Sequence, residues 1–346
     1  MTTMTDVKNN KQIEMGVGGS GGMFMYANPF AETMPRESLA QLQGQLLSKT
    51  VKWAYEKTAF YHAKLDAAGV AADDIKTIED IKKLPFTDHE EFVNTAPLDF
   101  VSGPLSTMIR LRLQEASNIV RAYTGEDVGR NVEMVTRGLV AGGVNRGSLV
   151  ALVGQTMDEA ILDVQYAAEV LGATVVPFAS DFIQSFRLIE QFGVDTIIGD
   201  PTRILQLIIM AQSSGKDIRH LPIRSYFCLN EAVQNPLEEY LKNRTDAEIY
   251  DLYVSNDLGC TGMLFSCPEK GGLHIAEDYF YPEVLNFSSP VPSEKGQMGE
   301  LVVTALAQQA MPVLRYRTGQ AVILKEEPCQ CGRTSLRMLT PFARGK

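Results

Sequence analysis

The spacing of hydrophobic residues divides the chain into a helical first part, a hairpin and a long run of alternating strands and helices. Apolar residues recur at three- to five-residue intervals from Met34 to Glu91, which predicts helices, the last of them ended by Pro85. Two short alternating runs, Met108 to Leu113 and Ile119 to Tyr123, predict an antiparallel hairpin.

After Thr124, short apolar runs alternate with longer amphipathic segments. The predicted strands are 148–153, 173–178, 196–199 and 225–229, and the predicted helices are 127–144, 157–171, 182–192 and 201–213. This alternation is typical of βαβ units, so we expect an α/β fold around a mostly parallel sheet.

The last part of the chain, from about residue 250 to 346, is richer in strands and turns. Met298 to Thr304 and Met311 to Arg317 read as strands. No clear linker interrupts the middle of the chain, so residues 26–346 are expected to form one large domain with a β-rich carboxyl part. Residues 1–25 are polar and then glycine-rich, without the features of a secretion signal, and are expected to be a flexible leader.

Composition narrows the range of partners. The 346 residues carry a net charge of −10, which disfavours nucleic acid as a partner because phosphates must be neutralised by Lys and Arg. No run of about 18 or more apolar residues occurs, so no membrane span is expected. The odd count of 5 cysteines favours a reducing, cytoplasmic compartment over a disulfide framework.

Four residues have the composition of a zinc site. Cys267 and His274 are followed at a distance by Cys329 and Cys331, and three thiolates with one imidazole make a closed tetrahedral set. Spacing alone leaves a second interpretation open, in which these are scattered buried cysteines and a surface histidine.

Several segments resemble the phenylacetate-CoA ligase branch of the adenylate-forming enzymes. They keep their order along the chain and include IYDLYVSNDLGCTG (Ile249 to Gly262), GELVVTALAQQAMPVLRYRTG (Gly299 to Gly319) and PCQCGRT (Pro328 to Thr334). The resemblance covers about residues 34–346. It implies the large domain of that fold, activation of an aryl or acyl carboxylate with ATP before transfer to CoA, a structural zinc on the four residues above, and a homodimer.

The phosphate-binding loop of that family departs from its pattern here. The family has a turn of the type SSGTTGKP between two hairpin strands, whose backbone N–H groups and Lys hold phosphates. The stretch from Leu111 to Asn118 contains neither Gly nor Lys, and Glu115 would face a polyanion. The following Tyr123 and Thr124 are retained. We therefore expect no conventional binding of ATP and Mg²⁺.

Other family positions that contact the nucleotide also differ. The Mg²⁺-holding Glu of Tyr-Gly-x-x-Glu corresponds to Asp257 after Tyr253, and the ribose-binding Asp corresponds to Gln320. The adenine wall retains only Glu231, which follows Asn230. The chain ends at about the hinge to the small domain, so the catalytic Lys of that domain is expected to be absent.

Cys260 is the remaining candidate nucleophile, because a thiol can take an acyl group without ATP. The alternative is a small residue filling a tight turn, and no histidine is placed nearby by the sequence. Three functions remain open. The chain either transfers acyl or aryl groups from a thioester or acyl-adenylate, or binds an acid as the partner of a full-length ligase or carrier protein, or adenylates through an unconventional ATP site.

Overall fold

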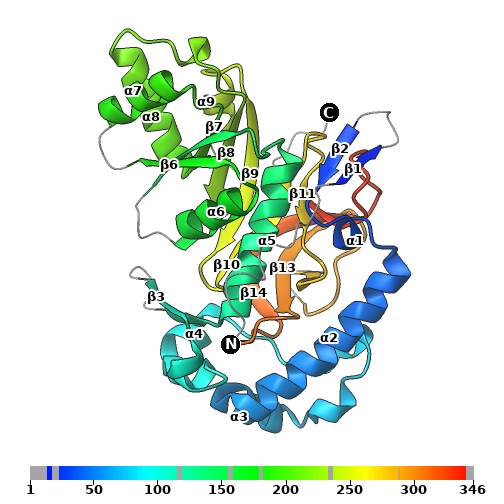
Figure 1. Cartoon of the computed structure of the whole chain (residues 1–346). Helices are drawn as coiled ribbons and strands as arrows, with labels where there is room; N and C mark the ends of the chain where they lie inside the picture. Colours follow the sequence, from blue (N-terminus) through cyan, green and yellow to red (C-terminus); the bar gives the residue numbers. More distant parts are fainter. Residues whose placement is uncertain are drawn as a thin grey trace.

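We describe a computed structural model of the chain over residues 14–17, 23–114, 119–154, 159–178, 182–232, 237–287 and 289–339. An 11-stranded sheet runs through these residues in the order β12-β13-β14-β15-β11-β10-β9-β8-β7-β5-β6. Helices cover one half of the sheet, and the amino-terminal helices wrap the other half (Figure 1).

One half of the sheet is parallel. Its strands are β5 (Leu149–Val153), β6 (Thr174–Phe178), β7 (Thr196–Gly199), β8 (Ser225–Asn230) and β9 (Glu248–Ser255). The helices of this half are α6 (Glu159–Val170), α7 (Phe182–Phe192), α8 (Pro201–Ser213) and the short α9 (Glu238–Lys242). All four pairings among these strands are parallel, which confirms the predicted βαβ units.

The other half is antiparallel and forms the β-rich part. Its strands are β10 (Cys260–Ser266), β11 (Leu273–Ile275), β12 (Phe280–Leu285), β13 (Met298–Ala305), β14 (Tyr316–Lys325) and β15 (Arg337–Leu339). The strand expected at 311–317 was placed too early. Arg315 adopts a φ of 44°, which breaks the extended backbone just before β14 begins at Tyr316.

The amino-terminal helices are α1 (Pro29–Glu32), α2 (Arg36–Lys57), α3 (Ala59–Ala68) and α4 (His89–Asn94). Thr58 ends α2 in extended conformation, and its side chain then caps α3 by accepting from Tyr61 N. The helix expected before Pro85 is instead a 3₁₀ segment, Ile78–Lys83, with other 3₁₀ turns at Ala72–Asp74, Pro97–Phe100, Leu105–Thr107 and Ile218–His220. Pro85 lies directly beyond its cap residue Leu84, which prevents the segment from continuing as a longer helix.

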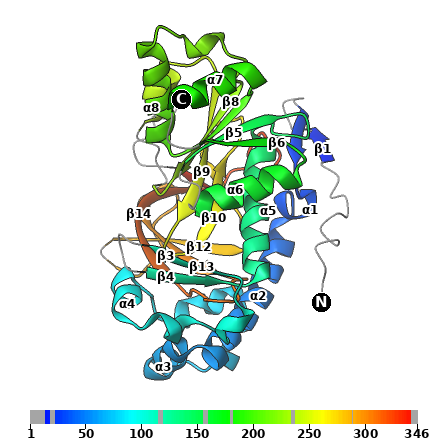
Figure 2. The same cartoon turned by 60° about the vertical axis from the view of Figure 1, so that its left-hand side comes forward.

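Helix α5 (Gly125–Ala141) lies against the sheet where the two halves meet, beside α6 and β10 (Figures 1 and 2). Gly138 permits this close approach, because a Cβ there would lie 2.3 Å from Leu252 Cδ2 and 3.1 Å from Phe265 Cβ. The helix therefore places its first turns next to the start of β10, where the candidate site lies.

Two hairpins lie outside the large sheet. β3 (Arg110–Gln114) pairs antiparallel with β4 (Ile119–Tyr123), as predicted. β1 (Glu14–Val17) pairs with β2 (Met23–Tyr26), so strand structure occurs within the segment 1–25 that the sequence suggested as a flexible leader. No helix of the described residues is long and apolar enough to cross a membrane.

Candidate functional site

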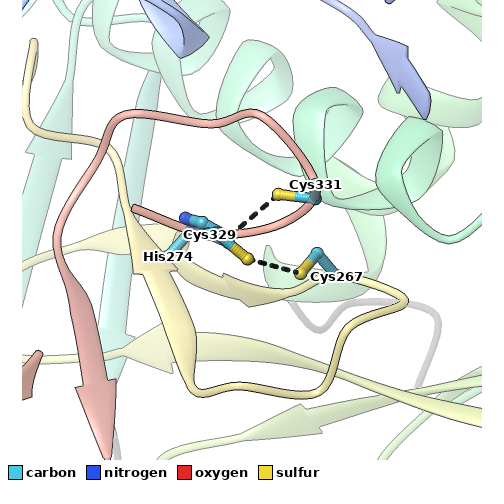
Figure 3. A group of neighbouring side chains, drawn as sticks. All are labelled: Cys267, His274, Cys329 and Cys331. Atoms are coloured by element: carbon cyan, nitrogen blue, oxygen red, sulfur yellow. Dashed lines mark hydrogen bonds between the residues drawn. The ribbon is translucent and has the colours of Figure 1, made fainter. Parts of the chain in front are cut away.

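The four predicted metal ligands converge on one buried point. Cys267 directly follows β10, His274 lies in β11, and Cys329 and Cys331 lie in the loop between β14 and β15 (Figure 3). Their ligand atoms all lie within 4.8 Å of one another. Cys267 and Cys329, which are 62 positions apart in the sequence, therefore meet through the pairing of β10, β11 and β15.

The distances fit tetrahedral zinc. Cys267 Sγ lies 3.7 Å from Cys329 Sγ, too far for a disulfide but close to the ~3.8 Å edge that Zn–S bonds of about 2.3 Å produce. Cys331 Sγ lies 3.4 Å from His274 Nε2. His274 Nδ1 lies 2.9 Å from Ser335 Oγ, a contact that orients Nε2 toward the sulfurs.

Hydrogen bonding and burial shift the pKa values of this cluster in both directions. A hydrogen bond from Cys267 lowers the pKa of the Cys329 thiol, and the same bond raises the pKa of Cys267. Burial lowers the pKa of His274, so its imidazole is neutral at pH 7. A neutral imidazole and a readily formed thiolate are the ligand forms that bind zinc.

A second set of predicted residues gathers at the carboxyl ends of β8 and β9. Asn230 and Tyr253 are direct neighbours in the register of these strands. Asn230 Nδ2 donates to Asp251 Oδ1 at 2.8 Å, and the Asn256 side chain just beyond β9 donates to the exposed Glu231. Of the residues that the sequence assigned to nucleotide and substrate contacts, Asn230, Glu231 and Tyr253 thus lie at this edge of the sheet.

Asp257 is already bonded to two donors. Its Oδ2 lies 3.0 Å from His89 Nδ1 and accepts a hydrogen bond from the Tyr316 hydroxyl. Burial, followed by the bond to Asp257, raises the pKa of Tyr316, which therefore stays a neutral donor. The position of His89 next to Asp257 was not predicted, because it depends on a tertiary contact. A backbone bridge between Thr87 and Tyr316 brings the start of α4 to β14.

Gln320 is not joined to these residues by a described hydrogen bond. It lies on β14 next to Gly319, whose φ is 67°, where the register with β13 shifts. Its backbone N–H donates to Thr318 Oγ1 at 3.1 Å. The predicted ribose-facing residue thus lies on an irregular part of β14.

Cys260 begins β10 opposite Ser255 and is 2% exposed. It belongs to an apolar cluster that includes Leu258 and Met263. The described hydrogen bonds of three histidines go to other groups: His62 to Tyr55 O, His89 to Asp257, and His274 to Ser335 and Cys331. Burial among apolar residues disfavours the thiolate that a nucleophile needs.

A small pocket opens beside Gly259, directly before Cys260. Its wall is apolar and aromatic with a few polar groups, formed by Arg121, Ala122, Tyr123, Asp127, Arg130, Asn131, Met134, Gly259, Tyr279, Phe280, Ala307, Gln308 and Met311. Gly259 has a φ of 61°, and a Cβ there would lie 2.8 Å from Arg121 Nε. Arg121 was not predicted as a site residue, because only the fold shows that this strand residue is buried.

Two of the expected differences from the family's sequence pattern fall outside the described residues. They are the loop segment 115–118, which contains Glu115, and the chain end from residue 340 onward. The strands on either side of the loop are described, with Arg112 opposite Arg121 in the register of β3 and β4.

Comparisons with known proteins identify the fold and then the family. The chain superposes on 2-hydroxyisobutyryl-CoA ligase in complex with 2-HIB-AMP and CoA with a TM-score of 0.82 at 18% identity, over 90% of this chain and 75% of the other. The architecture is therefore that of the adenylate-forming enzymes. No protein-family profile matches the chain.

Sequence relatives give the branch of that superfamily. The chain is 31% identical to phenylacetate-coenzyme A ligase of Thermus thermophilus over 325 residues, which cover 91% of this chain and 72% of the relative. It is also 31% identical to the Escherichia coli enzyme of the same name over 294 residues, covering 83% and 67%. The chain belongs to the phenylacetate-CoA ligase family.

Proposed function

We propose that this family member handles an acyl or aryl group supplied as a thioester or acyl-adenylate, and that it does not form the adenylate itself. The observation that carries this proposal is the state of Asp257. At the position of the family's metal-holding acid, its Oδ2 is bonded to both His89 and Tyr316, two donors that compete with Mg²⁺ for this oxygen. A small pocket with a largely apolar wall lies directly before Cys260, the candidate acyl carrier.

In the catalytic form of the proposal, Cys260 carries the acyl group. Its thiolate attacks the thioester carbonyl, the C–S bond to CoA breaks, and CoA leaves as a thiolate that takes up a proton. A nucleophilic acceptor then attacks the acyl-cysteine and releases the Cys260 thiolate. The proposed substrate-binding residues are Asn230, Glu231, Tyr253, Asp257 and Gln320.

A second candidate function is favoured by the burial of Cys260. A thiol that is 2% exposed in an apolar cluster is a poor nucleophile. In this alternative the chain binds an acid without transforming it, as the partner of a full-length ligase or of a carrier protein. A homodimer in the cytoplasm is part of both proposals.

We also propose that Cys267, His274, Cys329 and Cys331 hold a structural zinc ion. With four protein ligands the tetrahedral shell is complete, so the metal would tie β10, β11 and the β14–β15 loop together without activating water or substrate.

Calorimetry on the full chain tests the proposal, with four probes: Mg²⁺-ATP, CoA, phenylacetyl-CoA and phenylacetate. Binding of phenylacetyl-CoA with no heat from Mg²⁺-ATP is the expected result. Binding of Mg²⁺-ATP would overturn it and favour an unconventional ligase. Binding of phenylacetate without the thioester would favour the second candidate.

Mass spectrometry separates transfer from binding. Wild type and Cys260→Ala are incubated with a panel of aryl- and acyl-CoA thioesters. A mass increase of one acyl group on wild type alone supports the catalytic form. No adduct on Cys260 across the panel, with thioester binding intact, removes Cys260 from the mechanism.

A further inference from the structure

The β14–β15 loop, which carries two of the candidate zinc ligands, also holds the amino-terminal segment of the chain. Residues 326–336 of this loop contain no helix or strand, and they lie beside β2 and α1 (Figure 1). The Tyr26 hydroxyl donates to Cys331 O at 2.8 Å, across 305 positions of sequence. Thr334 Oγ1 donates to Met34 O at 2.7 Å. The two ends of the described chain are therefore joined directly at the metal cluster.

A buried ion pair strengthens this junction. Arg333 Nε donates to Glu32 Oε2 at 2.6 Å, and Arg333 Nη2 donates to Met25 O at 2.9 Å. The side chains of Arg333 and Glu32 are only 1% and 2% exposed. Separating such a pair leaves a buried charge uncompensated, which is strongly unfavourable. The position of the amino-terminal segment is therefore tied to the position of Arg333.

The junction also connects to a metal ligand through close packing and charge. Gly332 has a φ of 85°, and a Cβ there would lie 2.3 Å from Tyr26 Oη. The Arg333 guanidinium lies 5.0 Å from the centroid of the Tyr26 ring. Burial acts against the charge of Arg333, whereas Glu32 and Cys331 raise its pKa. Arg333 thus interacts with the docked segment on one side and with a candidate zinc ligand on the other.

The contacts among the four candidate ligands are weak without a metal. Cys267 Sγ lies 3.7 Å from Cys329 Sγ, and Cys331 Sγ lies 3.4 Å from His274 Nε2. A thiol is a weak donor and a weak acceptor, whereas bonds to zinc contribute folding free energy directly. A metal ion would therefore fix the shape of the loop and, with it, the carbonyl of Cys331 and the guanidinium of Arg333.

We propose that zinc binding at this cluster and docking of residues 25–34 are coupled, so that each strengthens the other. The inference rests on the proposed zinc site and goes beyond it by assigning Tyr26, Glu32 and Arg333 as positioning residues for the ligands. Coupling is reciprocal: the metal alters docking by the same factor by which docking alters metal affinity. The amino-terminal segment is thus a latch that closes when the metal binds and loosens when the metal is lost.

Zinc affinity tests the coupling from the side of the segment. Glu32→Gln removes the charge that pairs with Arg333 and leaves all four ligands in place. Competition with a chromogenic chelator measures the zinc affinity of the full chain. We expect the affinity to fall by about 10- to 100-fold, the loss that follows removal of outer partners of metal ligands. Tyr26→Phe removes only the bond to Cys331 O and should lower the affinity by about 2- to 10-fold.

Glu283→Gln is the matched control for Glu32→Gln. Glu283 also pairs with a buried arginine, Arg315, at 2.8 Å, and its side chain is 10% exposed. It lies on β12 and makes no described hydrogen bond with residues 326–336. This variant should keep the zinc affinity of wild type. An equal loss in both variants would mean that general destabilisation lowers the affinity, and it would overturn the coupling.

Hydrogen exchange tests the coupling from the side of the metal, on wild type with zinc and with a chelator. Chelation should lower the amide protection of residues 25–34 by about 10-fold or more, and should leave that of β7 (Thr196–Gly199) unchanged. Faster exchange in residues 326–336 with unchanged protection of residues 25–34 would overturn the coupling. This arm and Tyr26→Phe decide the matter if Glu32→Gln does not fold.

The outcomes separate this inference from the zinc assignment. Wild type that binds no zinc overturns both. Zinc bound with the same affinity by wild type, Glu32→Gln and Tyr26→Phe overturns the coupling alone and leaves the structural zinc in place.

Discussion

His89 Nδ1 lies 3.0 Å from Asp257 Oδ2, although 168 residues separate the two in the chain. The Tyr316 hydroxyl bonds the same carboxylate oxygen from the other half of the sheet. Three segments, the start of α4, the end of β9 and the start of β14, thus meet at the position where the family places a metal-holding acid. The carboxylate serves to join these segments in this chain.

Double-mutant cycles should show unequal coupling of Asp257 to its two donors. Tyr316 is 2% exposed, so its bond to the carboxylate should couple by about 1–2 kcal/mol. The His89 side chain is 51% exposed, and solvent screening should limit its coupling to at most about 0.5 kcal/mol. Urea unfolding measures both coupling energies. It is applied to wild type, to the single variants Tyr316→Phe, His89→Ala and Asp257→Asn, and to the two double variants. Equal couplings would contradict the arrangement.

Gly262 should tolerate no side chain. Its φ is 80°, and a Cβ there would lie 2.8 Å from Val135 N in the backbone of α5. Gly262→Ala should therefore lower the free energy of unfolding by about 2–5 kcal/mol, from left-handed strain and from the clash. Gly69→Ala is the control, since its φ is 65° but nothing lies within 4 Å of the added Cβ, and it should cost only about 1–2 kcal/mol. Equal losses in urea unfolding would show that the contact with α5 is unimportant.

In the α/β half, short apolar runs alternate with longer amphipathic segments, and this pattern made that half predictable. The predicted bounds of β7, α7 and α8 agree with the structure, because apolar runs bounded by Gly, Asp and Pro determine these elements within a few residues. The clustering of Cys267, His274, Cys329 and Cys331 was likewise predictable, since residue type and family resemblance both pointed to a shared site for them.

The features of the fold and of the candidate site that were not predicted depend on tertiary contacts, which no local sequence pattern shows. Arg315 turns the chain before β14 because its guanidinium binds Glu283 at 2.8 Å and Leu84 O at 2.9 Å, partners that are remote in the sequence. The pairing of His89 with Asp257 has the same origin. Arg121 looks in the sequence like an ordinary strand residue, and only the packed hairpin shows that its charge is buried.

The metal cluster should hold one zinc ion per chain. Cys267→Ser should lose the metal and more than the roughly 0.5–3 kcal/mol of an ordinary substitution, because zinc binding contributes directly to folding. Elemental analysis by mass spectrometry and thermal unfolding with and without a chelator measure both effects. Cys260→Ala is the control and should retain zinc. Purified wild type without stoichiometric zinc would refute the assignment.

The hydroxyl of Tyr61 should make stability depend on pH in alkaline solution. Burial raises the pKa of Tyr61 from 10.0 to about 12 in the folded protein. Below pH 10 both states keep the proton, so this group adds no pH dependence. Between pH 10 and about pH 12 the unfolded chain releases the proton while the folded chain retains it. Stability should therefore fall as the pH rises, by about 1.4 kcal/mol per pH unit and about 2–3 kcal/mol in all.

Tyr61→Phe isolates this effect from other groups that titrate in the same range. At pH 9 the variant should be less stable than wild type by about 1–3 kcal/mol, because the buried Leu314 N–H loses its acceptor, the Tyr61 hydroxyl at 2.9 Å. At pH 11 the difference should shrink by about 1 kcal/mol, since only wild type has the ionising hydroxyl. Tyr240→Phe, on an exposed residue of α9, should show no such change. A wild-type advantage that stays constant from pH 9 to pH 11 in urea unfolding would mean that Tyr61 ionises alike in both states, which would contradict the effect of its burial on the pKa.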